Sequence, residues 1–195
     1  MNNSREKLLN VAFDEIYHNG YYATSVDKIL KSAKMNKGSM YHFFKSKKEL
    51  GLAVVNERVA TYIEDKYGVL LQYDANIIDE LLKLIKDRKK FDFITGCKVN
   101  NLIQELSSKD KEFKSALEVV YFRFEKIIEE VLQKAIVNNE IKHDDAKALG
   151  IYVVASLEGC LITAKKSHNA DMFQDCISQL ELFLNSLKIT NIINK

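Results

Sequence analysis

The sequence predicts an all-α protein with about nine helices. Proline, which breaks helix interiors, is absent from the 195 residues, and only seven glycines occur. Apolar residues recur at a spacing of three or four along almost the whole chain, which is the period of an amphipathic helix. The alternation of apolar and polar residues that is typical of strands does not recur. A helical bundle is therefore the expected architecture.

The first fifty residues contain three short helices that are separated by capping residues. We expect the first helix to begin near Ser4 and to end at Gly20, because glycine favours the position after a helix. Ser25 and Asn36 are good N-caps for the second and third helices, since their side chains can accept from free backbone N–H groups. These helices span residues 4–19, 26–33 and 37–43.

Longer helices follow. The first of them begins after Ser46, which stands three residues before Glu49 in a capping-box arrangement. The apolar period and the polar breaks between segments predict helices at about 47–71, 76–90, 95–107, 110–138, 144–167 and 170–188. The chain is thus expected to contain a three-helix domain at residues 1–50 and a larger helical domain at residues 51–195.

The charge of the chain is distributed unevenly. The formal net charge is only +2, yet residues 1–50 contain nine basic and five acidic side chains, a net charge of +4. A basic end on a near-neutral body is what a local contact with DNA requires. Lysines scattered over a solvated face would give the same charge, so charge alone leaves both interpretations open.

The three cysteines, Cys97, Cys160 and Cys176, are odd in number and widely spaced. This pattern argues against a disulfide framework and against a thiolate metal cage, and it favours a reducing cytoplasm. The amino terminus carries charges where a signal peptide needs an apolar core. The most apolar run, residues 148–164, contains Glu158 and is shorter than the roughly 20 residues of a membrane span. We therefore expect a cytoplasmic protein without a membrane segment.

The second and third short helices, joined by a tight turn, form the minimal helix-turn-helix unit. Met40, Phe43 and Phe44 can anchor the third helix and leave its other side free to enter a major groove of double-stranded DNA. Lys37 can reach a guanine edge or a phosphate, and Tyr41 can bond phosphate oxygens. The candidate DNA-binding residues are Thr24, Ser25, Asn36, Lys37, Gly38, Ser39, Tyr41, His42 and Lys47.

Residues 24–50, TSVDKILKSAKMNKGSMYHFFKSKKEL, resemble the amino-terminal signature of the TetR/AcrR family of bacterial repressors. Residues 37–44 match its K-G-[ST]-[LIM]-Y-x-[HYF]-F recognition segment. The resemblance implies a homodimer that binds a palindromic operator, with an inducer pocket and a dimer-forming helix pair in the carboxy-terminal helices. Lys34 departs from the family, which often has glycine in this turn. A left-handed backbone there would strain a lysine.

The last two predicted helices are candidates for the dimer interface. Residues 151–164 are apolar on more than one face, so the helix must be covered on two sides. Ala155, Ser156 and Gly159 are small enough to allow another helix to approach closely. We expect the two helices of each subunit to form an isologous four-helix bundle. An intramolecular core is the alternative.

The segment that begins at Gly96-Cys97 is similar to a subgroup of the family that responds to electrophiles and hypochlorite. The matching pattern is G-C-x-x-x-x-L-x-x-E-[LVM]-[SA]. The resemblance implies that Cys97 is the sensing residue and that Lys165 lies near it. A cysteine at a helix amino terminus close to a lysine has a stabilised thiolate and reacts faster. A buried, inert cysteine is the alternative.

No pattern in the sequence indicates an enzyme, a cofactor or a metal site. The four histidines have no ligand spacing, and there is no nucleophile elbow or phosphate-binding loop. The expected function is therefore a repressor released from DNA by a small molecule or an electrophile. The alternatives are a constitutive or architectural DNA-binding protein without an inducer, an activator, and a helical domain whose similarity to a helix-turn-helix is accidental.

Overall fold

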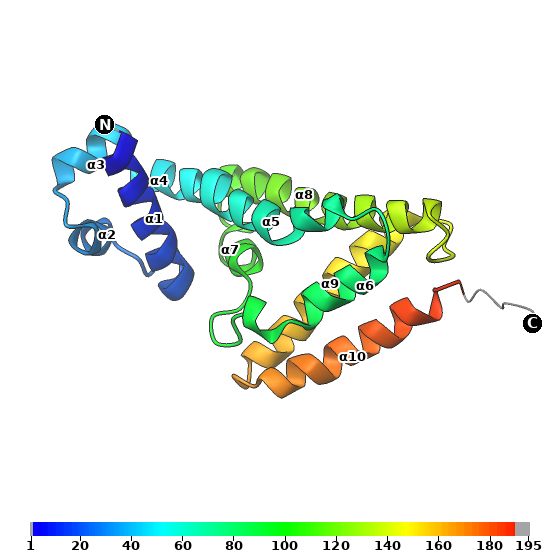
Figure 1. The fold of residues 1–195 in the computed structure, drawn as a ribbon. Helices are drawn as coiled ribbons and strands as arrows, with labels where there is room; N and C mark the ends of the chain where they lie inside the picture. The colour runs from blue at the N-terminus through cyan, green and yellow to red at the C-terminus, as the bar shows by residue number, and fades with distance from the viewer. Residues whose placement is uncertain (1, 190–195) are drawn as a thin grey trace, which may run out of the picture. The chain divides into compact units, whose positions relative to one another are not determined.

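The computed structural model describes residues 2–189, and the prediction of an all-α fold is confirmed within them (Figure 1). The only extended pairing among these residues is an isolated bridge between Ile141 and Lys188. The α-helices are α1 (Asn2–Asn19), α2 (Val26–Ala33), α3 (Lys37–Phe43), α4 (Lys47–Ala53), α5 (Ala60–Tyr67), α6 (Ile77–Lys86), α7 (Lys98–Leu106), α8 (Lys111–Val137), α9 (Ala146–Lys165) and α10 (Ala170–Ser186).

The helix predicted at residues 47–71 is continuous but not uniform. A π-helical stretch, Val54–Val59, separates α4 from α5, and a 3₁₀ segment, Gly68–Gln72, follows α5. Single π-helical turns inside α-helices are rare and occur often at functional sites. Val54, Val55 and Val59 are buried in this stretch, and their spacing in the sequence does not distinguish a π-helix from an α-helix.

Side chains cap the amino termini of α4 and α9, whereas α1 begins at Asn2, before the start expected near Ser4. Ser46 Oγ accepts from the Glu49 N–H at 3.1 Å, as the capping-box arrangement predicts. The return bond differs, because Glu49 Oε2 accepts from the Lys45 N–H at 2.7 Å and not from the cap residue itself. Asp145 caps α9, as its side chain accepts from the Ala148 N–H at 2.9 Å.

The chain forms two compact units. The first contains residues 1–63 and 98–121, and the second contains residues 64–97 and 122–195. The first unit therefore extends beyond the fifty residues predicted for the amino-terminal domain. Within it, α1 packs against α2, α3 and α4, and α7 contacts the π-helical stretch.

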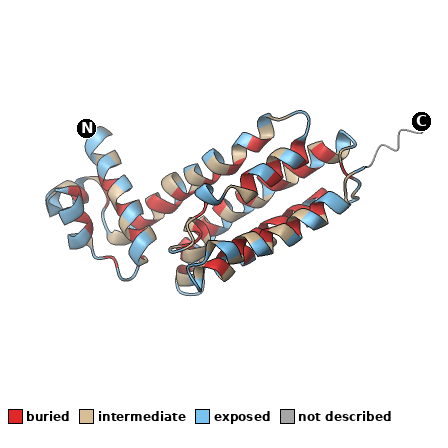
Figure 2. Cartoon of the chain, turned by 60° about the horizontal axis from the view of Figure 1, so that its bottom comes forward, coloured by how far each residue is buried: buried red, intermediate tan, exposed pale blue. Residues whose placement is uncertain are grey.

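The core of the second unit lies between its helices, where buried residues form stripes on the faces that meet (Figure 2). Here α9 lies beside α10, which also packs against α6. Gly150 lets α9 approach α8 closely, since a Cβ at this position would be 3.1 Å from the backbone N of Glu129. An ion pair between Lys86 and Glu181, 2.6 Å apart, joins α6 to α10.

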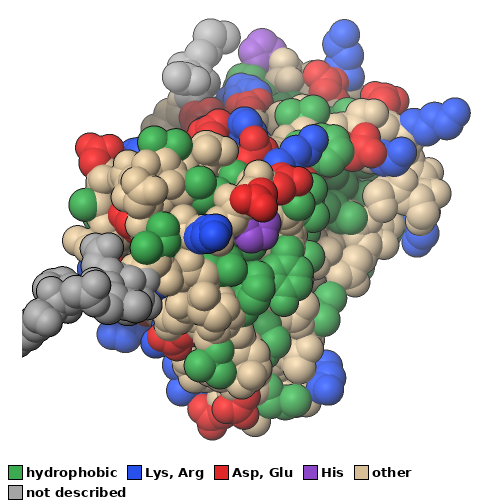
Figure 3. Space-filling view, turned by 90° about the vertical axis from the view of Figure 1, so that its right-hand side faces the viewer, with side chains coloured by type: hydrophobic (Ala, Val, Ile, Leu, Met, Phe, Trp, Pro, Cys, Tyr) green, Lys and Arg blue, Asp and Glu red, His purple; other side chains and the backbone are tan. Residues whose placement is uncertain are grey.

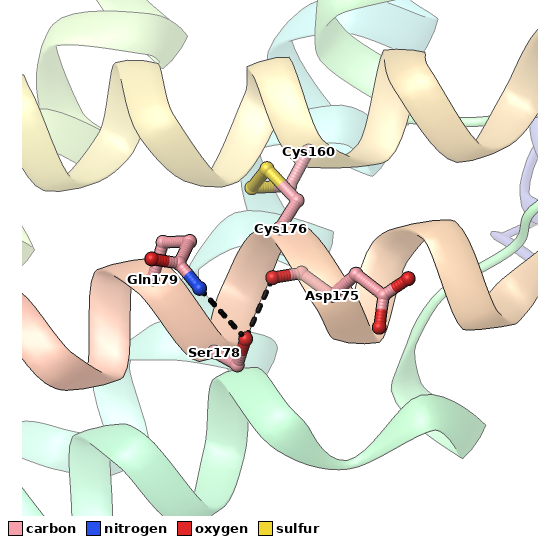
Figure 4. The surroundings of a disulfide bond; sticks show 5 residues. All are labelled: Cys160, Asp175, Cys176, Ser178 and Gln179. Carbon is pink, nitrogen blue, oxygen red and sulfur yellow. Dashed lines mark hydrogen bonds between the residues drawn. A yellow bond between two sulfur atoms is a disulfide. The ribbon is translucent and has the colours of Figure 1, made fainter.

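The structure corrects the interpretation of the cysteines. Cys160 of α9 and Cys176 of α10 form a disulfide, with Cα atoms 5.4 Å apart (Figure 4). Beside it, Ser178 donates to the Asp175 carbonyl at 2.7 Å and accepts from Gln179. The prediction failed because sequence spacing carries no information about which helices are neighbours. Cys97 lies outside the disulfide and is buried.

Helix α9 is long and apolar enough to cross a membrane by length and composition alone. Half of its most apolar window is buried inside the structure, where α9 packs against α10. The helix is longer than the run of residues 148–164 seen in the sequence, and core helices of soluble proteins can have the same length and composition.

Candidate nucleic-acid interface

The turn between α2 and α3 has the geometry of a Schellman motif. Lys34 adopts the left-handed conformation, with φ 53° and ψ 47°. The Lys34 N–H bonds the Lys31 carbonyl at 3.1 Å, and the Met35 N–H bonds the Leu30 carbonyl at 2.9 Å. These two bonds satisfy the last carbonyls of α2 and fix the direction in which the chain enters α3. The strain predicted for Lys34 is therefore present.

Lys34→Gly is expected to raise the free energy of unfolding by about 0.5–1 kcal/mol, because glycine adopts this conformation without the steric penalty. Urea denaturation of the two proteins measures the difference. Lys31→Gly is the matched control: it lies in the last turn of α2, where glycine should lower stability by about 1 kcal/mol. Destabilisation by both substitutions would contradict the strain.

Helix α3 is capped at one end and anchored on one side. Asn36 Oδ1 accepts from the Ser39 N–H at 2.8 Å and from the Ser39 hydroxyl at 3.1 Å. Met40 and Phe44 are buried, with 0% and 3% exposure, whereas Phe43 is only partly covered. Of the three residues predicted to anchor α3, Met40 and Phe44 therefore do so fully and Phe43 only in part.

The opposite side of α3 is polar and open. Lys37, Gly38 and His42 are exposed, as is Tyr41 at 55%, while Ser39 is half-buried. Small residues at the start of this helix allow a ligand to approach its backbone. The structure thus brings most of the sequence-predicted residues of α3 to one exposed surface of the first unit.

Lys37 forms an ion pair with Asp27 of α2, with 3.0 Å between Nζ and Oδ1. The hydrogen bond to Asp27 raises the pKa of Lys37 above its ordinary value. Both side chains are well exposed, and such pairs contribute little to stability. The ammonium can therefore exchange Asp27 for a phosphate with little loss of stability.

The two candidates that precede α2 differ. Ser25 is exposed, and its hydroxyl caps α2 by accepting from the Lys28 N–H at 3.1 Å. Thr24 is fully buried, and its hydroxyl donates to the carbonyls of Gly20 at 2.7 Å and Glu15 at 3.1 Å. The Thr24 side chain is thus a structural part of the α1–α2 turn and is not available to a phosphate.

Two neighbouring lysines of α4 have different surroundings. The Lys47 ammonium lies 4.4 Å above the Tyr21 ring and 3.5 Å from the Tyr22 carbonyl, and desolvation lowers its pKa. No contact is predicted for Lys48 from the sequence. In the structure its ammonium binds Asp110 at 2.7 Å and Glu112 at 2.6 Å. Hydrogen bonds to these carboxylates raise the pKa of Lys48 to about 12.

Helix α1 supports the other helices of the first unit through charged side chains. Glu15 accepts from Ser32 of α2 at 2.6 Å and pairs with Lys28 at 3.0 Å. The Ser32 hydrogen bond, followed by the one to Lys28, lowers the pKa of Glu15. Near the other end of α1, Arg5 binds both carboxylate oxygens of Glu57 in the π-helical stretch.

The α1–α2 turn is held by α7, through a contact that sequence reasoning missed. Glu105 Oε2 accepts from the Tyr21 N–H at 2.8 Å, and Oε1 accepts from the Tyr22 N–H at 2.7 Å. The Tyr21 ring is buried, packs against Phe113 at 4.8 Å and lies under Lys47. Only one feature of the sequence could have pointed to this contact. Glu105 is the glutamate of the pattern that begins at Gly96-Cys97, and no role is predicted for that glutamate from the sequence.

The first residue of α7 also contacts α1. The Lys98 ammonium lies 3.3 Å from the centre of the Tyr17 ring, and the rings of Phe13 and Tyr62 are 5.4 and 5.3 Å away. Ammonium groups at such distances are attracted by the ring faces.

The two candidate sensing residues belong to the second unit. Cys97 is 9% exposed and immediately precedes α7, so the predicted position at a helix amino terminus is correct. Lys165 is the last residue of α9 and is half-buried. Among the described residues, no group of three or more histidines, cysteines or acids is arranged to hold a metal ion.

On the face drawn in Figure 3, acidic and basic side chains are interspersed, and hydrophobic side chains reach the surface between them. A surface that follows a phosphate backbone is expected to carry one sign of charge. The mixed charge of this face therefore does not favour contact with a phosphate backbone.

Two protein-family descriptions match the chain. Residues 8–54 match "Bacterial regulatory proteins, tetR family". Residues 75–179 match the "Transcriptional regulator LmrA/YxaF-like, C-terminal domain". Together these matches include the helix-turn-helix and most of the second unit.

Known proteins resemble the chain over most of its length. An HTH-type transcriptional regulator in the lacX 3′ region of Lactococcus lactis subsp. lactis is 30% identical, over 89% of each chain. The HTH-type transcriptional regulator LmrA of Bacillus subtilis (strain 168) is 29% identical over 91% of this chain and 96% of its own.

A third similar protein is the HTH-type transcriptional repressor NemR of Escherichia coli (strain K12), 26% identical over 59% of this chain and 60% of its own. The crystal structure of the reduced form of E. coli NemR has the same fold. Its TM-score is 0.85 at 21% identity, and the alignment covers 98% of this chain and 100% of that chain.

Proposed function

Because the chain belongs to the TetR family of bacterial transcriptional regulators, we propose that it is a cytoplasmic repressor that binds a palindromic operator as a homodimer. A small molecule or an electrophile acting on the second unit releases it from DNA. The observation that carries the proposal is the α2–α3 pair, in which one side of α3 is anchored by buried side chains and the other is polar and exposed.

In this proposal α3 enters the major groove with its amino-terminal end foremost. Lys37 reaches a guanine edge or a phosphate, while Gly38 and Ser39 allow the backbone to approach the bases. Tyr41 and His42 bond phosphate oxygens. The remaining contacts are with the DNA backbone, from Ser25, Asn36 and Lys47. Thr24 is left out of the interface because its hydroxyl is buried.

The proposed dimer interface lies on α9 and α10. Ile151, Ala155, Gly159 and Ile162 are exposed and repeat every three or four residues, so they form one stripe along α9. A Cβ added at Gly159 would meet no neighbouring atom within 4 Å, which leaves room for a second helix. Leu182 of α10 is 63% exposed. An apolar surface of this kind supports pairing with a second copy in a two-fold arrangement.

The signal is proposed to act at Cys97, with Lys165 as the neighbouring cation. The support is the location of Cys97 directly before α7, where the dipole of the helix favours a thiolate. Since α7 also contacts the α1–α2 turn, a change at its first residues has a direct route to the DNA-binding helices.

Selection of duplexes from a random library by the purified protein tests DNA recognition. A palindromic consensus is expected.

Tyr41→Ala should weaken binding to this duplex about tenfold, and Lys47→Ala should lower the salt slope by about one unit. Lys126→Ala, on α8 of the second unit, is the control and should change neither. The absence of any selected consensus sequence would refute the proposal that the protein binds an operator. Unchanged binding by Tyr41→Ala would refute the proposed contact between Tyr41 and a DNA phosphate.

Release by an electrophile is tested separately with N-ethylmaleimide and hypochlorite on the protein–duplex complex. Both reagents should dissociate the wild-type complex, because modification of Cys97 displaces the start of α7. Cys97→Ser should bind DNA normally and resist release. Release of Cys97→Ser to the same extent would show that Cys97 is structural, and stable complexes in both proteins would favour a constitutive binder.

Asp27→Asn is expected to tighten operator binding several-fold, because it frees the Lys37 ammonium from its ion pair and removes a negative charge that would face DNA. The salt slope should become steeper by about one unit. Fluorescence anisotropy over a salt series measures both quantities. Asp14→Asn, an exposed acid of α1, is the control for net charge. An equal effect of both substitutions would show that Asp27 acts only through net charge.

A further inference from the structure

We propose that Glu105 is a positioning residue for operator binding. Its carboxylate holds the α1–α2 turn, and through that turn it fixes where α2 and α3 stand relative to α7. This inference rests on the proposed function, because the position of α3 has a consequence only if α3 binds DNA. Glu105 lies on α7 and acts through the turn, without a DNA contact of its own.

The contact uses the whole carboxylate. Its two oxygens accept from two consecutive backbone N–H groups, those of Tyr21 at 2.8 Å and Tyr22 at 2.7 Å. Hydrogen bonds to an ionised acceptor are stronger than neutral ones, and a pair of parallel bonds fixes orientation as well as distance. The bonds end on the main chain, so they control the path of the backbone directly.

The turn is shaped to receive this carboxylate. Gly20 has a φ of +84°, which favours glycine. A Cβ at this position would be 3.1 Å and 3.3 Å from the two carboxylate oxygens of Glu105. A side chain here would be strained by the positive φ and would require the carboxylate to shift by a few tenths of an ångström. Gly20 therefore serves both the end of α1 and the close approach of α7.

The position of the turn determines the position of α2. Two residues after Tyr22, the Thr24 hydroxyl is bonded to the Gly20 carbonyl at 2.7 Å, and Ser25 then caps α2. The Schellman bonds at Lys34 fix the direction in which the chain leaves α2 and enters α3. A displacement of the turn is thus carried to the exposed face of α3.

The other end of α7 is attached to α1 as well. Lys98 contacts the Tyr17 ring at 3.3 Å, and seven residues later Glu105 contacts the turn. Seven residues of α-helix extend over about 10 Å. With a contact at each end, α7 cannot rotate or slide without moving the last turn of α1 or breaking one of the contacts. Glu105 is accordingly the contact through which a shift of α7 reaches the α1–α2 turn.

The sign of the effect distinguishes positioning from simple electrostatics. An acid near a DNA-binding surface repels phosphates, so its removal should tighten binding. The negative charge of Glu105 acts on Lys47, whose pKa it raises against the lowering by desolvation. Removal of the Glu105 carboxylate would leave the positive charge of the Lys47 ammonium without this nearby negative charge. Positioning predicts the opposite, since a loosened turn lets α2 and α3 sample orientations that do not fit the groove.

The test measures the affinity of Glu105→Ala for the duplex that the wild-type protein selects from a random library. We expect binding about tenfold weaker, with the salt slope unchanged. Glu105→Gln, which keeps one acceptor oxygen and loses the charge, should recover part of the affinity. Glu118→Ala removes the same charge from an exposed acid of α8 in the same unit, and it should bind as tightly as wild type or slightly tighter.

Amide hydrogen exchange in the absence of DNA provides the second measurement. The Tyr21 and Tyr22 amides should exchange faster in Glu105→Ala than in wild type, while amides in the middle of α8 keep their rates. A Glu105→Ala protein that binds as tightly as Glu118→Ala, or that keeps both tyrosine amides protected, overturns the inference. If Glu105→Ala does not fold, the same two measurements on Glu105→Gln decide.

Failure of this inference is distinguishable from failure of the proposed function. A wild-type protein that selects no duplex refutes the proposed function. The inference is then refuted as well, even if amide hydrogen exchange shows that Glu105 binds the Tyr21 and Tyr22 N–H groups. A wild-type protein that selects a duplex, with no loss of affinity in Glu105→Ala and Glu105→Gln, refutes the inference alone.

Discussion

Leu182→Glu is expected to convert the proposed dimer into monomers and to weaken operator binding about a hundredfold or more, since two linked half-site contacts become independent. Leu182 is 63% exposed in the single chain, so a carboxylate at this position is solvated and the monomer keeps its fold. In a two-fold interface the substitution occurs twice, so two uncompensated charges are buried.

Light scattering and sedimentation measure the oligomeric state, and anisotropy with the selected duplex measures the affinity. Val137→Glu is the matched control, because Val137 is a similarly exposed apolar residue, 68%, at the end of α8. It should leave the dimer intact. A Leu182→Glu protein that remains dimeric would exclude α10 from the interface, and dissociation of the control as well would point to a different surface.

Cys176→Ser is expected to lower the free energy of unfolding by about 3 kcal/mol, because the loop that Cys160 and Cys176 close contains about 15 residues. For a chain of this size the change corresponds to a decrease in Tm of about 6–12 °C. The main cause is the greater conformational entropy of the unfolded chain once the covalent link between α9 and α10 is gone.

Thermal denaturation of wild type with and without dithiothreitol provides the comparison. The reductant should lower the Tm of wild type and have no effect on Cys176→Ser. Cys97→Ser is the control, since Cys97 takes no part in the disulfide and its loss should leave the response to reductant unchanged. Thiol alkylation of the unreduced, unfolded wild-type chain should label Cys97 alone. Labelling of all three cysteines would contradict the disulfide.

Local chemistry explains what the sequence could predict. Ser25, Asn36 and Ser46 cap helices through N–H groups three residues away, so the information lies within one turn. The exposed and buried sides of α3 follow from helical periodicity in the same way. The left-handed conformation of Lys34 agrees with the resemblance, because Lys34 stands at a turn position where the family often has glycine.

The features that the sequence could not predict depend on contacts between distant segments. Glu105 meets the Tyr21 N–H across 84 positions, and Lys48 meets Glu112 across 64. Neither partner is marked by its own neighbourhood in the sequence. The bond between Cys160 and Cys176 likewise requires that α9 and α10 lie side by side, which spacing alone does not determine.

The ion pairs of the first unit have a consequence for the speed at which the protein finds its site. Lys28, Lys37 and Lys48 each already hold a carboxylate of the same chain. Attraction to DNA of arbitrary sequence depends on uncompensated positive charge. A protein whose lysines are partly neutralised stays for shorter times on unrelated DNA and returns to solution more often. More of each search is then spent sampling new stretches of the chromosome, and fewer copies are needed to keep one operator occupied.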